Sequence, residues 1–261
     1  MSASTLSNLY THRELLWAWT MRVIRARYQQ SILGGLWAIA QPVATVAIFT
    51  AVFSFILKVD TQGVPYPVFS YTAMVPWLLF STSITDMAES IVGNMNLVAK
   101  IYFPRDILVI AAMLARVLDF LIASLVLVVL MVAFSLPVFQ VQWLFLPVIL
   151  LVQLALALGI GLMLAALNAF YRDVRHLVAL LLQLWLYATP IIYPVSLVPE
   201  RLRPYYFINP MAGVIEAYRA VLLYGQMPGN EFYISAAVAL IVLLLGYSLF
   251  KRVEHRFADI V

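Results

Sequence analysis

Long apolar stretches separated by short polar gaps run along most of the chain. Five of them contain about 19 residues or more, enough for a helix to cross a hydrocarbon core of ~30 Å, and the stretch at 177–193 is near the lower limit. The stretches cover residues 36–57, 71–92, 107–136, 143–170, 177–193 and 232–250. This pattern predicts an all-α polytopic membrane protein with six transmembrane helices in one membrane domain over residues 1–261.

The pattern changes before the first stretch and between the last two. Over residues 12–30, large apolar side chains fall on one broad arc of a helix, and Arg22, Arg25 and Gln29 form a polar ridge opposite. We expect an amphipathic helix in the membrane interface, and a helix packed on a soluble partner is the alternative.

Residues 194–230 are too apolar for an exposed loop. Asn209 followed by Pro210 is typical of a helix start, so we predict short re-entrant helices on the outer side.

Small residues recur every four positions in the fourth stretch, at Ala157, Gly161 and Ala165. Such spacing lets another helix approach closely. It favours packing within one bundle over a dimer seam.

Basic residues gather in alternate gaps between the apolar stretches. Eleven of the sixteen Lys and Arg residues lie in the N-terminal segment, the second gap, the fourth gap and the C-terminal end, and four lie in the other gaps. Short basic loops stay in the cytosol, so both termini should be cytosolic. We recognise no cleavable signal peptide, and the first span is expected to direct insertion into the bacterial cytoplasmic membrane.

The amino-acid composition limits the ligands and reactions that can be expected of this chain. Hydrophobic residues make up 64% of the chain and charged residues 11%, compared with about 25% in soluble domains. The net charge of +4 suits anionic lipid headgroups rather than nucleic acid. The chain has no cysteine, no GxxxxGK[ST], no HExxH and no GxSxG, and its three histidines are far apart. We therefore expect no cofactor or metal in this chain and no enzymatic activity.

Four charges lie inside the apolar stretches. Asp86 and Glu89 are one helical turn apart in the second stretch, and Arg116 and Asp119 are one turn apart in the third. Because a charge facing lipid is costly, all four should face the bundle interior and pair. A structural ion pair between the two spans is favoured, and a charged patch beside a substrate path is the alternative.

Two short cytosolic loops combine aromatic residues with charges of both signs. Their candidate docking residues are Lys100, Tyr102, Phe103, Pro104, Arg105 and Asp106 in one loop, and Tyr171, Arg172 and Asp173 in the other. An aromatic anchor with a charged rim is typical of a protein docking surface. The alternative is that the basic residues only set the topology.

Five motifs recur in order along the chain: RYQQSILGGLWAIAQP from Arg27, FPRD from Phe103, FYRDV from Phe170, TPIIY from Thr189 and NPM from Asn209. With the predicted topology, they resemble the permease subunits of bacterial ABC exporters for lipid-linked polysaccharides such as O antigen, capsule and teichoic acid. The resemblance covers nearly the whole chain.

The resemblance implies a homodimer with two separate ATPase subunits, which bind the ATP and Mg²⁺. It implies that the Lys100–Asp106 loop is a coupling helix, and that a Leu33-Gly34 turn lies near the substrate entrance. Family substrates are glycans on an undecaprenyl diphosphate anchor. Our hypothesis is that Arg22, Arg25 and Arg27 attract that diphosphate, and membrane anchoring of these arginines is the alternative.

Aromatic residues are frequent toward the outer half of the predicted spans. Most fit an interfacial belt. We expect a subset to stack on sugar rings along the path: Phe53, Tyr71, Trp77, Tyr187 and Tyr193. The sequence thus predicts an exporter permease for a lipid-linked glycan, with two alternatives: a drug or small-lipid exporter of the same type, and a membrane glycosyl- or prenyltransferase.

Overall fold

The computed structural model describes residues 11–29, 34–101 and 103–260, with side chains described as far as Phe257. Leu33 and Tyr102, both predicted site residues, lie outside these ranges. In the described part the fold is all-helical, as predicted, and contains no strand. The α-helices are α2 (Arg13–Tyr28), α3 (Trp37–Phe49), α4 (Tyr66–Ser90), α5 (Met95–Lys100), α6 (Asp106–Ala133), α7 (Leu146–Phe170), α8 (Val174–Tyr187), α9 (Arg203–Tyr206), α10 (Pro210–Leu222) and α11 (Asn230–Val253).

Short helices extend several of these elements. The 3₁₀ helix η1 (Gly34–Leu36) and the π-helix η2 (Thr50–Ile56) continue α3 at both ends. The 3₁₀ helices η4 (Val141–Phe145) and η6 (Glu254–Ile260) precede α7 and follow α11. Among the described residues, four helical segments are long and apolar enough to cross a membrane: Gly34–Ile56, Asp106–Ala133, Val141–Phe170 and Asn230–Phe257.

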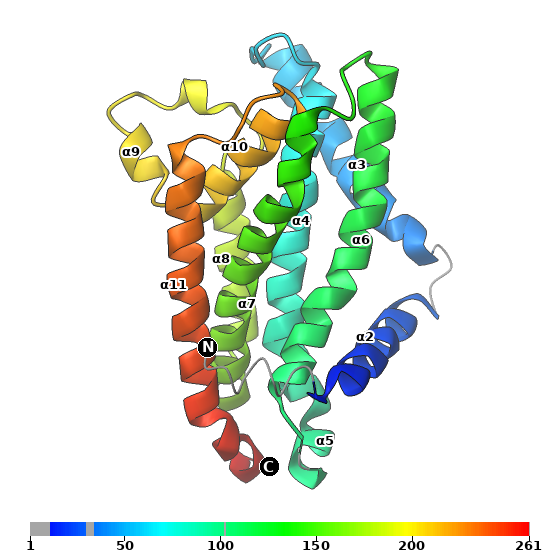
Figure 1. Ribbon diagram of the computed structural model, residues 1–261, viewed down its shortest axis with the longest axis vertical. Coiled ribbons are helices and arrows are strands. Elements are labelled where there is room, and N and C mark those ends of the chain that lie inside the picture. Colours follow the sequence, from blue (N-terminus) through cyan, green and yellow to red (C-terminus); the bar gives the residue numbers. More distant parts are fainter. Residues whose placement is uncertain (1–10, 30–33, 102, 261) are drawn as a thin grey trace.

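The α4 helix forms the centre of the bundle. It packs against α3, α6, α7, α8 and α10, and most of its residues are buried (Figure 1). Gln153 and Asn168 on α7 donate hydrogen bonds to the Pro76 and Ala88 carbonyls of α4, and a Cβ on Gly161 would overlap Met87. The small-residue face predicted on α7 therefore packs inside the bundle.

A second close contact joins α7 and α11 through glycines that sequence reasoning missed. A Cβ added to Gly246 would lie 2.1 Å from the Gly159 carbonyl oxygen, and one added to Gly159 would meet the α11 backbone. The two backbones touch because neither residue has a side chain.

The segment after α7 differs from the prediction. The helix predicted to reach Tyr193 ends at Tyr187, because Pro190 cannot continue it and disfavours helical backbone at Thr189. At 14 residues, α8 is about 21 Å long. The predicted start of α10 is confirmed: the Asn209 side chain accepts a hydrogen bond from the Met211 amide at 3.0 Å.

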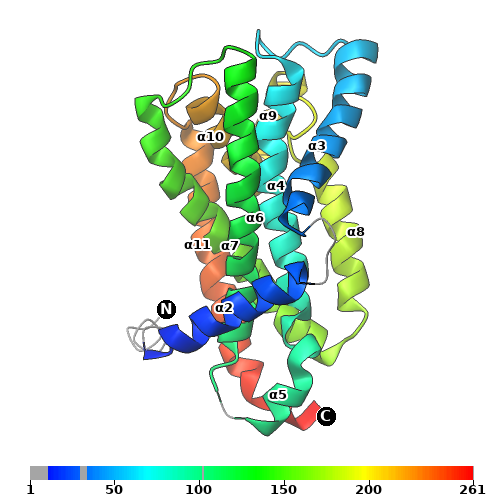
Figure 2. The same ribbon diagram turned by 90° about the vertical axis from the view of Figure 1, so that its right-hand side faces the viewer.

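The N-terminal helix lies outside the bundle. Figure 2 shows α2 crossing the lower part of α6 at a steep angle, with α5 and the C-terminal end farther down the same end. The α10 helix lies at the opposite end of the molecule (Figure 1). This arrangement brings the last turn of α2 against charged residues of α4 and α6.

Candidate functional site

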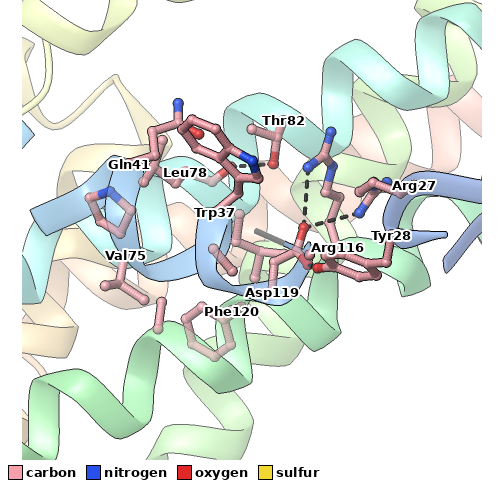
Figure 3. Close-up of a pocket in the computed structure, with 15 residues that line it drawn as sticks. Arg27, Tyr28, Trp37, Gln41, Val75, Leu78, Thr82, Arg116, Asp119 and Phe120 are labelled. Carbon is pink, nitrogen blue, oxygen red and sulfur yellow. Dashed lines mark hydrogen bonds and ion pairs between the residues drawn. The ribbon is translucent and has the colours of Figure 1, made fainter. Parts of the chain in front are cut away.

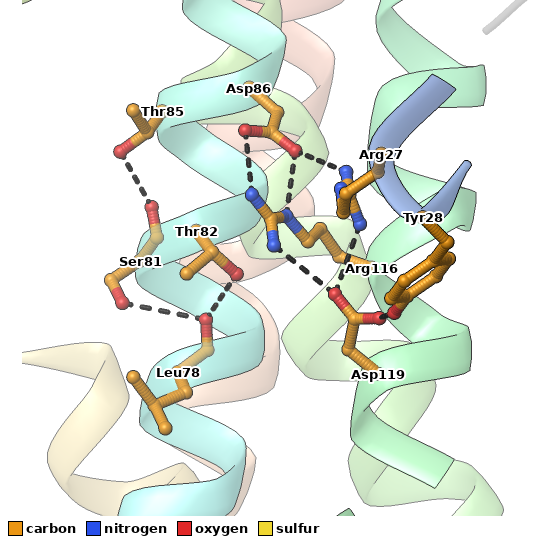
Figure 4. Close-up of polar contacts among 9 residues, drawn as sticks. All are labelled: Arg27, Tyr28, Leu78, Ser81, Thr82, Thr85, Asp86, Arg116 and Asp119. Carbon is orange, nitrogen blue, oxygen red and sulfur yellow. Dashed lines mark hydrogen bonds and ion pairs between the residues drawn. The ribbon is translucent and has the colours of Figure 1, made fainter. Parts of the chain in front are cut away.

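Five side chains from three helices form one polar cluster, which we call the charge network (Figure 4). Arg27 on α2 contacts Asp86 on α4 at 2.7 Å and Asp119 on α6 at 3.0 Å. Arg116 on α6 binds both oxygens of Asp86, at 2.6 and 3.0 Å, and reaches Asp119 at 3.1 Å. The Tyr28 hydroxyl donates to the second oxygen of Asp119.

The charge network is electrically balanced. Two guanidinium groups face two carboxylates, and the four charged side chains are 18–24% exposed. Charges at this depth persist only when they are paired and hydrogen-bonded, and planar guanidinium groups can bridge two carboxylates. The network therefore holds three helices together, where the sequence predicted a link between two.

Arg27 is the member whose position sequence reasoning missed, because it was predicted, with Arg22 and Arg25, to attract the lipid diphosphate. Charge counting could have found it. Asp86, Glu89 and Asp119 lie inside the predicted spans with a single internal cation, Arg116, so the spans alone cannot pair every carboxylate. A second cation had to come from outside the spans, and Arg27 is at the end of the adjacent helix.

Tyr28 completes the network as a neutral donor. Burial, followed by its hydrogen bond to Asp119, raises the pKa of Tyr28 to about 12. The phenol therefore keeps its proton over the physiological range and donates to the carboxylate.

A cavity of about 110 Å³ adjoins the charge network on the α3 side (Figure 3). Arg27, Arg116 and Asp119 line one part of it, and Gly34 and Trp37 line another. Gly34 has a φ of +49°, a backbone conformation that suits glycine at a turn. The residue predicted at the substrate entrance thus lies beside the charge network.

A second, more open hollow of about 270 Å³ lies between α4 and α8. Asp86 and Arg116 line it together with Trp77, Gln183 and three hydroxyl side chains of α4: Ser81, Thr82 and Thr85. Each hydroxyl donates to a carbonyl of its own helix (Figure 4), so its oxygen can still accept a hydrogen bond. We call this hollow the α4–α8 groove.

The other two predicted entrance arginines are on the exposed face of α2. Arg22 and Arg25 line an open hollow of about 520 Å³, and the Arg22 guanidinium lies 4.4 Å from the Trp19 ring centroid. Both are exposed, whereas Arg27 is half-buried in the charge network. The three arginines therefore occupy two different environments on one helix.

Glu89 contradicts the prediction that all four intramembrane charges pair. It is exposed and makes no ion pair within the described ranges. One turn beyond Asp86, it has left the bundle interior and lines a hollow of about 340 Å³ with Arg172 and Arg175.

Comparison with known proteins identifies the family. The model for the ABC-2 type transporter family matches residues 14–223, most of the chain. The chain belongs to the ABC-2 type transporter family.

Relatives of this ABC-2 transporter match over almost their full length. An O-antigen export system permease protein of Myxococcus xanthus is 30% identical, with 96% of each chain covered. A protein of the same name from Klebsiella pneumoniae is 29% identical over all of both chains. The polysialic acid transport protein KpsM of Escherichia coli is 26% identical, covering 90% of this chain and 92% of its own. The chain is a multi-pass membrane transport subunit and not an enzyme.

The predicted coupling loop of this ABC-2 transporter is partly occupied by its own C-terminal end. Arg105 donates to the Glu254 carbonyl, and Asp106, 3% exposed, pairs with Lys251 at 3.0 Å. Lys251 also pairs with Glu254 at 3.0 Å. Arg105 and Asp106 are therefore already bound within the chain, and buried Asp106 is not available to a partner.

Other residues of the two predicted docking loops remain accessible. Lys100 is exposed and Phe103 and Pro104 are partly exposed. The α5 helix, which ends at Lys100, lies beside the C-terminal end (Figure 2). Tyr171, Arg172 and Asp173 are all exposed in the turn between α7 and α8. Tyr171 is 68% exposed, which is unusual for a large aromatic side chain.

The five predicted path aromatics fall into three groups. Tyr71 is fully buried and donates to the Ala123 carbonyl at 3.3 Å, so neither of its faces is open to a sugar. Trp77 lines the α4–α8 groove. The other three do not line this groove. Phe53 stacks on Tyr66, and the Tyr193 hydroxyl donates to the backbone carbonyl of Tyr187, whose side chain is exposed.

Proposed function

We propose that this chain is the permease subunit of an ATP-driven exporter that moves polysaccharide linked to undecaprenyl diphosphate out of the cytosol. The observation that carries the proposal is similarity over nearly the full chain to proteins named for two different polysaccharides, O antigen and polysialic acid. A shared substrate class accounts for that better than a drug or a small lipid does.

The functional unit is a homodimer with two separate ATPase subunits, which bind ATP and Mg²⁺. Each permease has six membrane segments, both termini in the cytosol of the inner membrane, and α9 and α10 as the outer re-entrant segment. The outward faces of α3 and α8 support a dimer contact, since Ile48, Leu180, Leu181 and Leu184 are each more than half exposed. The α8 helix also lines the α4–α8 groove, which would then lie near the dimer interface.

The lipid diphosphate binds first to Arg22 and Arg25 on the exposed face of α2. Guanidinium groups bind phosphate oxygens through paired hydrogen bonds. The diphosphate then competes with Asp86 and Asp119 for Arg27, which loosens α2 from α4 and α6. When the anion takes the place of the carboxylates at Arg27, Asp86 and Asp119 both keep Arg116 as a partner.

The glycan follows the α4–α8 groove. The hydroxyl oxygens of Ser81, Thr82 and Thr85 accept hydrogen bonds from sugar hydroxyl groups. Such contacts bind many sugars without fixing their order. Trp77, although it borders the groove, is 2% exposed and offers no open ring face. The ATPase docks on Tyr171, Arg172 and Asp173, with Tyr171 as its anchor. It also contacts the accessible residues of the Lys100–Asp106 loop, which are Lys100, Phe103 and Pro104.

Transport assays on reconstituted permease–ATPase complexes test this function. The double variant R22Q/R25Q leaves the charge network intact, and we expect it to reduce export of a lipid-diphosphate glycan at least about tenfold, since each charged hydrogen bond contributes ~1.5–3 kcal/mol. The matched control R252Q removes one exposed arginine at the C-terminal end and should export at the normal rate. Normal export by R22Q/R25Q would refute the entrance, and failure of the wild-type complex to export any lipid-linked glycan would refute the function.

A further inference from the structure

The C-terminal 3₁₀ helix η6 lies beside α5, at the end of the molecule that holds the first predicted docking loop (Figure 2). The candidate span Asn230–Phe257 has 28 residues and is about 42 Å long, which exceeds a hydrocarbon core of ~30 Å. Its last turns carry the charged residues Lys251, Arg252, Glu254 and Arg256. These turns therefore extend beyond the hydrocarbon core, next to the loop.

Polar contacts join η6 and the end of α11 to this first loop, Lys100–Asp106. Arg105 donates a hydrogen bond to the Glu254 carbonyl. Lys251, in the last turn of α11, pairs with Asp106 and with Glu254, each at 3.0 Å. Because Asp106 is the first residue of α6, these contacts hold the junction between the loop and its membrane span.

One aromatic ring of η6 contacts both loops. Phe257 is fully buried, and its ring centroid lies 5.8 Å from that of Phe170, the last residue of α7 and the neighbour of Tyr171 in the second loop. The Arg105 guanidinium of the first loop lies 5.8 Å from the same centroid. Ring pairs and ring–cation pairs at such separations attract each other. The Phe250 ring of α11 packs on Phe257 as well, at 5.6 Å.

We propose that η6 links the two docking loops mechanically, with Phe257 as the positioning residue, so that both loops move as one body with the partner ATPase. The inference rests on the proposed function, because it takes both loops to dock on that ATPase. Arg105 directly precedes α6 and Phe170 ends α7, so a displacement of either loop reaches both spans through one buried ring. Closely packed side chains transmit a displacement because they leave little space to absorb it.

Distances between the loops test the link. Because the chain has no cysteine, spin labels can be placed at Ala99 on α5 and His176 on α8, both exposed and outside the docking residues. The permease alone and its ATPase complex with a non-hydrolysable ATP analogue are measured in nanodiscs. We expect one narrow distance in both states for the wild type, and for F257A a broad distribution that shifts with the analogue. R256A, at the exposed neighbouring position, should match the wild type. A shift in the wild type, or a narrow unchanged distance in F257A, would overturn the proposal.

The amount of glycan exported per ATP hydrolysed separates positioning from a loss of folding. F257A leaves the docking residues Tyr171, Arg172 and Asp173 in place, so the complex should still hydrolyse ATP. Export per ATP should fall about fivefold, as expected for the loss of one aromatic contact. F257L fills most of the same volume and should restore the export ratio and the narrow distance. An equal fall of ATP hydrolysis and export in F257A would overturn the positioning role.

R105Q tests the link without creating an apolar cavity, and so applies even where F257A does not fold. It removes the donor to the Glu254 carbonyl and should broaden the loop distance in the permease alone, where ATPase docking cannot contribute. A wild-type distribution in R105Q would refute the polar part of the link. The distance measurements need no glycan. They are therefore decided even if the wild-type complex exports no lipid-linked glycan, which is the result that would refute the proposed function.

Discussion

Two arginine sites at opposite ends of the bundle show how differently one side chain can be used. Arg219 on α10 is 1% exposed, pairs at 2.8 Å with Glu216 one turn away, donates to the Ile191 carbonyl and lies 3.7 Å from the Phe69 ring centroid. Arg27 instead joins α2 to two other helices and is 21% exposed.

The two arginines differ in whether an outside anion can replace their carboxylate partners. Arg219 is enclosed by its own helix and its neighbours, so no outside anion can replace Glu216. Arg27 and Arg116 lie beside a cavity and the α4–α8 groove, and their partners can be exchanged for a ligand. Arg219 therefore stabilises the fold, whereas the charge network lies where a ligand can reach it.

The largest effect is expected from removing Arg219. R219M should destabilise the protein by about 3 kcal/mol, because it leaves Glu216 without its partner and breaks the contact with Phe69. Thermal unfolding in detergent measures the loss. R201M, at an exposed position nearby, should change stability by less than about 0.5 kcal/mol. Similar unfolding temperatures for the two variants would show that Arg219 is not structural.

A smaller loss is expected for R116Q, about 2 kcal/mol, because the network is partly exposed and Arg27 still pairs with both carboxylates. A double-mutant cycle of R116Q with D86N should give a coupling energy of about 1–2 kcal/mol. The same cycle with E89Q, one turn along α4, should give about zero coupling. Coupling to Glu89 as large as coupling to Asp86 would contradict the observed pairing.

Much of the fold follows from local sequence pattern. The long apolar helices and the start of α10 at Asn209 depend on residues within a few positions of each other. The early end of α8 could also have been predicted, since Pro190 interrupts the apolar run. Asp86 and Arg116 were expected to pair because each needs a partner in an apolar span.

The remaining contacts depend on where distant segments meet. Arg27 and Asp119 are 92 residues apart, and Arg105 and Glu254 are 149 apart. Helical periodicity gives the face on which a residue lies but not which helix covers that face. For this reason Tyr71 was expected in a path and lies in the core, and Asp106 was expected at a partner surface and pairs with Lys251.

An intermediate loss of stability is expected when the ion pairs at the C-terminal end are removed. K251M removes two ion pairs and leaves the buried Asp106 carboxylate without its partner, which should cost about 2 kcal/mol. Because Asp106 begins α6 next to the coupling loop, we expect faster amide exchange in α5 and at the start of α6. R252M, at the exposed neighbouring position, should exchange like the wild type. Equal exchange in both variants would mean that the C-terminal end does not brace the loop.

The smallest effect is expected at Tyr28. Y28F loses one hydrogen bond to Asp119 and should cost about 1 kcal/mol. Because folding raises the pKa of Tyr28 to about 12, its stabilising effect is complete below about pH 10, the ordinary tyrosine value, and is lost as the pH rises toward 12. The stability difference between wild type and Y28F should therefore shrink over that range. A difference that stays constant up to pH 12 would contradict the assigned role.

The lipid diphosphate is proposed to release α2 from the bundle by competing for Arg27. The chain has no cysteine, so two can be introduced for spin labels at Trp17 on α2 and Leu125 on α6, which are 66% and 68% exposed. Distances are measured in nanodiscs with the partner ATPase, with and without the lipid-diphosphate glycan. We predict a single short distance without the glycan, a second longer population when it is added, and that longer population already present in R27Q. One unchanged distance under all three conditions would contradict the proposed release of α2.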